Sequence, residues 1–169
     1  MKTASSQSYY SNDSHLALQN ITTYEDQFSE TTSGNNIFTT PPKILFVEDN
    51  LMLQNIFTEM LNLLGCKVYI AEDGYEAVSM ANKKAYDLIF MDIGLPKLNG
   101  IEATKSIRSQ EPSQHRNIIV ALTAYGNSVA KKCEAAGIND FYTKPVLIDD
   151  LTRILRYWLP HLLSPNNIH

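Results

Sequence analysis

Cysteine is scarce in this 169-residue chain, which contains only Cys66 and Cys133. The two lie far apart in the sequence, without the CxxC spacing or the neighbouring histidine that would indicate a metal or redox site. We therefore expect both to be free thiols, packed as small apolar side chains in a protein of a reducing compartment.

Long apolar runs and excess positive charge are also lacking. No stretch approaches the roughly 18 apolar residues of a membrane helix, and no basic segment followed by an apolar core stands at the N-terminus. The formal net charge is −4, with 14 basic against 18 acidic side chains, which does not suit binding to a nucleic acid. These absences predict a cytoplasmic protein that neither inserts into a membrane nor binds nucleic acid.

Valine is absent from residues 3–40, which are dominated by serine, threonine, asparagine and glutamine. Such a composition cannot offset the entropy of ordering, so residues 1–41 are predicted to form a flexible polar extension. Pro41-Pro42 marks its end, because the second proline excludes helical geometry at the first. A folded domain is expected at residues 42–160 and a C-terminal tail at 161–169. Aromatic residues of the extension leave local docking or capture of a partner open: Tyr9, Tyr10, Tyr24, Phe28 and Phe38.

From Lys43 onward, a strand pattern followed by a helix pattern repeats five times. The expected strands are residues 43–48, 66–71, 86–91, 118–122 and 139–142. Helices are expected from near Asn50 to Gly65, after Gly74, after Gly100, over about 128–136 before Gly137, and over about 148–158. The strand at 86–91 is apolar on both faces, as in a central parallel strand that helices cover on both sides. This alternation predicts a three-layer, doubly wound α/β fold with a five-stranded parallel sheet.

Polar side chains stand where four of these strands end: Glu48, Asp49, Asp92, Thr123 and Lys144. The ends of parallel strands face one crevice, so these side chains are expected to share a pocket. Its three acids suit Mg²⁺, with Asp49 and Asp92 as ligands, Glu48 acting partly through water and the Gly94 carbonyl as a further candidate ligand. One oxygen of Asp92 would then be available as a nucleophile, and Thr123 and Lys144 would contact the transferred phosphoryl group.

Each of these residues also has an ordinary structural interpretation. Asp49 would cap the helix that follows it, and Asp92 would cap the turn after its strand. Thr123 would be a simple strand residue and Lys144 a solvated lysine. The X-Pro restriction does fix the backbone at Lys144, and a cis Lys144-Pro145 bond would cost least at a proline. The combination of all five side chains favours phosphoryl chemistry over these separate interpretations.

Four motifs in order carry a family resemblance: VEDN at 47–50, FMDIGLPKLNGIEATKSIR at 90–108, ALTA at 121–124 and AAGINDFYTKPV at 135–146. Together they resemble the receiver domain of two-component response regulators, over about residues 43–159. The sequences VEDN, GIEATKSIR and FYTKPV resemble receivers of hybrid sensor kinases more than receivers fused to DNA-binding domains. The resemblance implies a flavodoxin-like sheet of strand order 2-1-3-4-5. It also implies Mg²⁺ as cofactor and a histidine kinase or histidine phosphotransfer protein as partner.

Roles follow from the resemblance residue by residue. Glu48 and Asp49 match the acidic pair, Asp92 the phosphoacceptor, Thr123 the switch hydroxyl and Lys144 the lysine that senses the phosphoryl group. Phe141 matches the switch aromatic, where tyrosine is commoner, and the stretch between Thr123 and Lys144 is one residue shorter than in most relatives. The implied protein is a phosphorelay component that catalyses its own phosphorylation and dephosphorylation, rather than a classical enzyme. It would signal through contacts with a downstream effector protein.

Other interpretations of the same architecture fit less well. A flavin-binding protein needs a phosphate loop after the first strand, where this chain has acids, and no GxGxxG for a dinucleotide follows any strand. A haloacid-type phosphatase would carry a DxD pattern after the first strand, which is missing. A receiver-shaped module that is never phosphorylated would be expected to have lost part of the set of five. The four histidines stand in no context typical of a kinase or phosphotransfer histidine.

The helix after Asn50 has more apolar residues than one buried stripe requires. Leu53 and Phe57 lie one turn apart near the acidic pair, and in receiver families this region contacts the helical bundle that carries the donor histidine. We therefore expect Leu53 and Phe57 to form part of a docking surface, with the alternative that both belong to the core.

Overall fold

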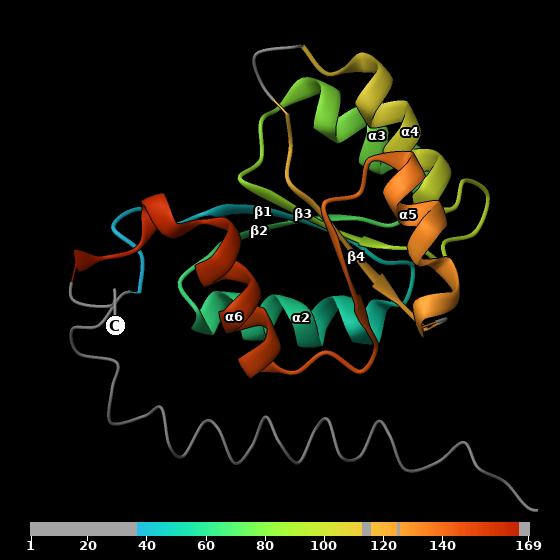
Figure 1. Ribbon diagram of the computed structural model, residues 1–169. Coiled ribbons are helices and arrows are strands. Elements are labelled where there is room, and N and C mark those ends of the chain that lie inside the picture. The colour runs from blue at the N-terminus through green and yellow to red at the C-terminus, as the bar shows by residue number, and fades with distance from the viewer. Residues whose placement is uncertain (1–36, 113–115, 125, 166–169) are drawn as a thin grey trace, which may run out of the picture. The chain divides into compact units, whose positions relative to one another are not determined.

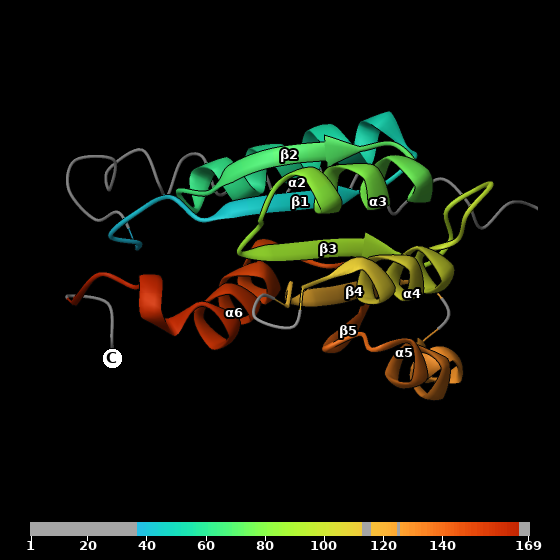
Figure 2. The same ribbon diagram turned by 90° about the horizontal axis from the view of Figure 1, so that it is seen from above.

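The computed structural model describes residues 37–112, 116–124 and 126–165, and it contains one five-stranded parallel sheet (Figure 1). The predicted extension, apart from residues 37–41, lies outside the described residues. The strands run in the order β2-β1-β3-β4-β5, which confirms the predicted topology (Figure 2). They are β1 (Lys43–Val47), β2 (Lys67–Ala71), β3 (Leu88–Asp92), β4 (Ile119–Thr123) and β5 (Asp140–Thr143).

Helices cover both faces of this sheet and complete a three-layer fold. Helices α3, α4 and α5 lie on one face, and α2 and α6 lie on the other (Figure 1). Their bounds are α2 (Leu51–Leu63), α3 (Gly74–Lys83), α4 (Gly100–Gln110), α5 (Ala130–Ala136) and α6 (Ile148–Trp158). Every residue of β3 and β4 is buried, which is why these strands are almost continuously apolar in sequence.

The predicted helix ends are confirmed by their caps. Asn50 precedes α2, and its side chain accepts hydrogen bonds from the backbone N–H groups of Met52 and Leu53. Gly65, after α2, and Gly137, after α5, have φ of 81° and 85°, a left-handed conformation that glycine adopts without steric cost. Residues Gly126–Val129 form a 3₁₀ turn before α5, so the α-helix begins slightly later than predicted.

The packed domain reaches beyond the boundaries drawn from the sequence at residues 42 and 160. Phe38 is only 2% exposed and forms an antiparallel bridge with Leu163. Around it, the N–H of Thr39 donates to Leu162 O at 2.8 Å, and the N–H of Ser164 donates to Ile37 O at 2.9 Å. One of the five aromatic residues assigned to the extension is therefore a buried residue of the folded part, held in place by backbone pairing with Leu163.

The two cysteines are unpaired and buried, as predicted. Burial raises the pKa of the Cys66 thiol to about 12, which keeps it protonated and unreactive. Among the described residues, no helix has the length and apolar character needed to cross a membrane.

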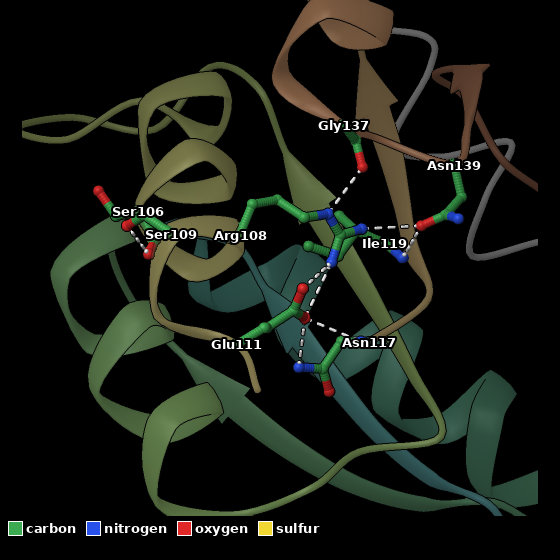
Figure 3. Close-up of polar contacts among 8 residues, drawn as sticks. All are labelled: Ser106, Arg108, Ser109, Glu111, Asn117, Ile119, Gly137 and Asn139. Carbon is green, nitrogen blue, oxygen red and sulfur yellow. Dashed lines mark hydrogen bonds and ion pairs between the residues drawn. The ribbon is translucent and has the colours of Figure 1, made fainter. Parts of the chain in front are cut away.

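A polar network joins α4 to the beginnings of β4 and β5 (Figure 3). The Arg108 guanidinium donates to both carboxylate oxygens of Glu111 at 2.9 and 2.8 Å, to Gly137 O at 2.8 Å and to Asn139 Oδ1 at 2.9 Å. Asn139 in turn contacts both backbone groups of Ile119, each at 2.8 Å. The network lies at the amino ends of the strands, opposite the edge where the predicted site residues stand, and fixes how β4 and β5 begin.

Loss of this network should destabilise the fold. We expect Arg108→Met to lower the free energy of unfolding by roughly 2–4 kcal/mol, because the largely buried carboxylate of Glu111 loses its cationic partner and the hydrogen bonds from α4 to Gly137 and Asn139 are broken. Urea unfolding measures the change. Lys105→Met is the matched control, since Lys105 forms an ion pair of the same spacing with Glu102 on α4 that is about half exposed, worth under about 1 kcal/mol. Equal losses in the two variants would contradict a structural role for the Arg108 network.

Candidate phosphoacceptor site

The five residues singled out from the sequence meet at the carboxyl edge of the sheet. Glu48 follows β1, Asp92 ends β3, Thr123 ends β4 and Lys144 follows β5. In the order β2-β1-β3-β4-β5, the chain reverses direction of winding between β1 and β3, and this switch point is where doubly wound sheets form their ligand crevice. The predicted convergence of residues that are almost a hundred positions apart is therefore observed.

Lys144 connects two of the three acids. Its Nζ lies 2.6 Å from Glu48 Oε2 and 2.8 Å from Asp92 Oδ2. Glu48, Asp92 and Thr123 are all buried, so the ammonium group compensates carboxylates that have lost most of their hydration. Lys144 is thus an ion-paired lysine of the crevice, which excludes the interpretation as a solvated surface residue. The Lys144-Pro145 peptide bond that follows it is cis.

Burial and pairing shift the pKa values of this cluster. Burial raises the pKa of the Glu48 carboxyl above its ordinary value, although the hydrogen bond from Lys144 opposes the shift. Burial lowers the pKa of Lys144, but its hydrogen bonds to Asp92 and Glu48 outweigh this, and its net pKa is raised. Lys144 therefore stays charged throughout the physiological range.

Asp49 completes a cluster of three acids. One carboxylate oxygen each from Glu48, Asp49 and Asp92 lies within 4.8 Å of the others, and Asp49 is exposed at the mouth of the crevice. Asn50 caps α2, so the interpretation of Asp49 as the helix cap is wrong. Against three carboxylates Lys144 supplies one positive charge, which leaves an excess of two negative charges for a divalent cation to balance.

The turn after Asp92 fits closely around it. Asp92 Oδ1 accepts a hydrogen bond from the N–H of Gly94 at 2.9 Å, so the carboxylate does brace its own turn, as the alternative interpretation held. The other oxygen, however, contacts Lys144. A Cβ at Gly100, where α4 begins, would lie 2.1 Å from the carbonyl oxygen of Asp92, so only glycine allows α4 to start this close.

Thr123 and Phe141 lie on the two strands beyond Asp92. Thr123 is fully buried, and it follows Leu122, the residue of β4 that pairs with Asp92. The carbonyl oxygen of Thr123 accepts a hydrogen bond from the backbone N–H of Lys144 at 2.9 Å. Phe141, on β5, is half-buried and packs against the core formed under α4 and α5. A backbone hydrogen bond thus joins the residue that carries the predicted switch hydroxyl to the residue that carries the ammonium group.

The predicted docking residues require a correction. Phe57 is 4% exposed and its ring stacks on Phe46 with centroids 4.6 Å apart, so it is a core residue and the prediction of an accessible Phe57 was wrong. Leu53 is half-buried. The apolar side chains that face solvent at the start of α2 are Leu51, at 69% exposure, and Met52, at 56%. The prediction that the helix has more apolar residues than it can bury was correct, but the residues predicted to be exposed were not the ones that face solvent.

Gln54 was not predicted from the sequence as a residue of the site. It is buried on the same helix, and its Nε2 donates to the carbonyl oxygen of Glu48 at 2.7 Å. The available signal was a polar residue at a position where the apolar stripe of α2, with Phe57 and Leu61, continues.

Removal of the Lys144 charge should destabilise the metal-free protein at neutral pH. Lys144→Met leaves two buried carboxylates without their cation, which we expect to cost roughly 2–4 kcal/mol in urea unfolding. Because the pKa of Lys144 is raised, its contribution is complete at neutral pH and is lost only as the pH rises through that pKa. Because the pKa of Glu48 is also raised, the difference from wild type should shrink as the pH falls through it and Glu48 becomes neutral.

Lys97→Met serves as the control for that measurement. Lys97 pairs with Asp73 at 2.7 Å, but its side chain is two-thirds exposed, so the loss of stability should be much smaller than in Lys144→Met. A Lys144→Met protein as stable as the control variant, at every pH tested, would contradict the pairing.

Known proteins share this sequence pattern and fold. Residues 44–156 match the response regulator receiver domain family. A hybrid signal transduction histidine kinase, kinase G of Dictyostelium discoideum, is 41% identical over 128 residues, which is 74% of this chain and 4% of that protein. The transcription factor SKN7 of Chaetomium thermophilum is 38% identical over 125 residues, or 73% of this chain and 16% of the relative. The chain thus spans less than a fifth of the length of these curated relatives.

Solved structures of receiver domains have a fold similar to that of this chain. The receiver domain of a sensor histidine kinase from Pseudomonas aeruginosa, with a magnesium ion coordinated in its active site cleft, is 41% identical with a TM-score of 0.66, covering 72% of this chain and 99% of that one. The co-crystal structure of the Saccharomyces cerevisiae histidine phosphotransfer protein Ypd1 with the receiver domain of its response regulator Ssk1 matches at 37% identity and a TM-score of 0.65, covering 72% of this chain and 90% of that chain.

Proposed function

The chain belongs to the response regulator receiver domain family, and we propose that it accepts a phosphoryl group on Asp92 from a phosphorylated histidine of a histidine kinase or a histidine phosphotransfer protein. The observation that carries the proposal is the buried carboxylate of Asp92, with Lys144 at 2.8 Å and two further acids at the same edge of the sheet. A structural aspartate would need one partner, whereas this one stands between acids suited to a divalent cation and a lysine suited to an anionic phosphoryl group.

The acidic cluster fits Mg²⁺. Asp49 and Asp92 would hold the ion directly, Glu48 would act partly through water because Lys144 already occupies one of its oxygens, and the Gly94 carbonyl is a further candidate ligand. When bound, Mg²⁺ supplies the positive charge that lets an anionic phosphodonor approach these acids. The relative from Pseudomonas aeruginosa, whose structure has magnesium in the same kind of cleft, supports this assignment.

The chain's own residues account for the transfer. An oxygen of Asp92 attacks phosphorus, the new O–P bond replaces the P–N bond to the donor imidazole, and that imidazole leaves on the partner. Lys144 then pairs with a phosphoryl oxygen in place of its contact with Asp92, and the Thr123 hydroxyl donates to another. Thr123 ends the strand beside Asp92, and Lys144 already contacts Asp92 from beyond β5, so little rearrangement is needed.

Labelling with a small phosphodonor tests the proposal. Incubation with Mg²⁺ and acetyl phosphate should raise the intact mass by one phosphoryl group, and Asp92→Asn or a metal chelator should abolish the increase. Asp73→Asn is the control, since Asp73 caps α3 and does not belong to the acidic cluster. Undiminished labelling of Asp92→Asn, or labelling that persists in excess chelator, would reject Asp92 or the metal requirement.

The phosphoryl group would also drive a switch. It adds about −1.5 to −2 charges beside Lys144 and Thr123, which would draw both toward it. Movement of Thr123 would open space toward β5, and the half-buried ring of Phe141 would enter it. Because Phe141 has no hydroxyl, this movement changes burial alone. The altered surface around α5 and β5 would be read by a downstream effector protein, in a phosphorelay of the cytoplasm.

Partner docking is proposed for the exposed start of α2. Leu51 and Met52 are the apolar side chains that face solvent beside Asp49, and they replace Phe57 in this role, with half-buried Leu53 at the margin. The complex of Ypd1 with a related receiver domain supports a histidine phosphotransfer protein as the kind of partner.

A pair of matched variants separates docking from chemistry. The double change Leu51→Ser and Met52→Ser should slow transfer from a phosphorylated histidine phosphotransfer protein roughly tenfold, since loss of an apolar interface anchor costs on the order of 1 kcal/mol or more. Labelling by acetyl phosphate should stay at the wild-type rate. Leu63→Ser, at the far end of the same helix and also exposed, should change neither rate. If the double variant loses transfer from the histidine protein and labelling by acetyl phosphate to the same extent, these side chains do not act in recognition.

A further inference from the structure

Gln54 occupies a position where an apolar side chain is expected. It lies on the buried stripe of α2 with Phe57 and Leu61, and it is itself buried. A primary amide removed from water costs about 1–3 kcal/mol unless it is hydrogen-bonded. A leucine or methionine here would fill similar space without that cost, so the amide calls for an explanation beyond packing.

The amide fixes the peptide unit that joins the two acids. Gln54 Nε2 donates to the carbonyl oxygen of Glu48 at 2.7 Å, and the N–H of Glu48 donates to Ala71 O of β2 at 3.1 Å. Both backbone groups of Glu48 are therefore held, one by the sheet and one by α2. The carbonyl held by Gln54 belongs to the peptide bond between Glu48 and Asp49. The orientation of this carbonyl therefore determines the position of the Asp49 backbone nitrogen.

The same turn is held from its other side. Gln54 donates its backbone N–H to Asn50 O at 2.9 Å, and the N–H of Asn50 donates to Glu48 Oε1 at 3.2 Å. Gln54 thus bridges the turn at Glu48 and at Asn50, on either side of Asp49. Asp49 is the exposed member of the acidic cluster, and the turn that carries it lies beyond the end of β1 at Val47.

We propose that Gln54 is a positioning residue for the acidic pair, whose side-chain amide holds the Glu48–Asp49 peptide so that the Asp49 carboxylate lies ready to bind Mg²⁺. The inference rests on the proposed function of the cluster as a magnesium site. Groups that orient metal ligands typically change metal affinity by about 10- to 100-fold when removed. A purely structural Gln54 would affect folding and leave the affinity of the folded protein unchanged.

The test compares Mg²⁺ affinity, measured by isothermal titration calorimetry, among folded variants. Gln54→Met keeps the length of the side chain and removes the donor, and it should weaken Mg²⁺ binding about tenfold or more. Gln54→Leu provides a second donor-free variant if methionine is not tolerated. Gln54→His at pH 8, where a neutral ring N–H can donate, should restore affinity to within about threefold of wild type. Amide shifts of Asp49 and Asn50 without metal should change in the donor-free variants.

Leu61→Val is the control for stability, because Leu61 is fully buried on the same stripe and has no part in the turn. It should lower the melting temperature and leave Mg²⁺ affinity unchanged. Wild-type affinity in both donor-free variants, or a loss no larger than in Leu61→Val, would overturn the role of Gln54 while leaving the magnesium site intact. Failure of the wild-type protein to bind Mg²⁺ would instead reject the proposed function, and the inference with it.

Discussion

The structure depends on one constraint, that acids buried at the end of a parallel sheet need cationic partners. Glu48 and Asp92 come from adjacent strands, and Lys144 reaches both from beyond β5. The lysine can do so only because β5 lies beside β4 in the observed register, with Thr143 opposite Thr123. One ammonium balances the charge incompletely, and the remaining negative charge is what the proposed divalent cation would compensate.

Strand β5 is held at both of its ends by charged groups. At its start, Asn139 takes hydrogen bonds from Arg108 and from the backbone of Ile119, and at its end Lys144 pairs with the acids. Phe141 lies between these two anchors and is only half-buried. A change in the partners of Lys144 therefore acts on a short strand whose far end is fixed, and the half-buried ring of Phe141 lies between these two ends.

Much of this could be predicted from the sequence, and the failures have physical causes. The ends of the strands could be predicted because β1, β3 and β4 are apolar runs that stop at a polar residue. Phe57 was misplaced because α2 has too many apolar residues for helical periodicity to decide which side is buried. Phe38 was assigned to the extension because its partner, Leu163, is more than a hundred residues away. Arg108 and Gln54 were missed because composition does not reveal when a polar side chain is buried with its hydrogen bonds satisfied.

Under the proposed function, the first turn of α2 would bring together three roles. A helix start needs a cap, a metal site needs unengaged carboxylates, and a docking surface needs exposed apolar area. Asn50 takes the cap, which leaves Asp49 to the metal cluster, while Leu51 and Met52 point to solvent and Gln54 points inward to the Glu48 carbonyl. Because consecutive helical residues face different directions, each role takes its own position within one turn. A partner that docks on Leu51 and Met52 therefore lies directly beside Asp49 in the chain, and recognition and metal binding would depend on the same local backbone.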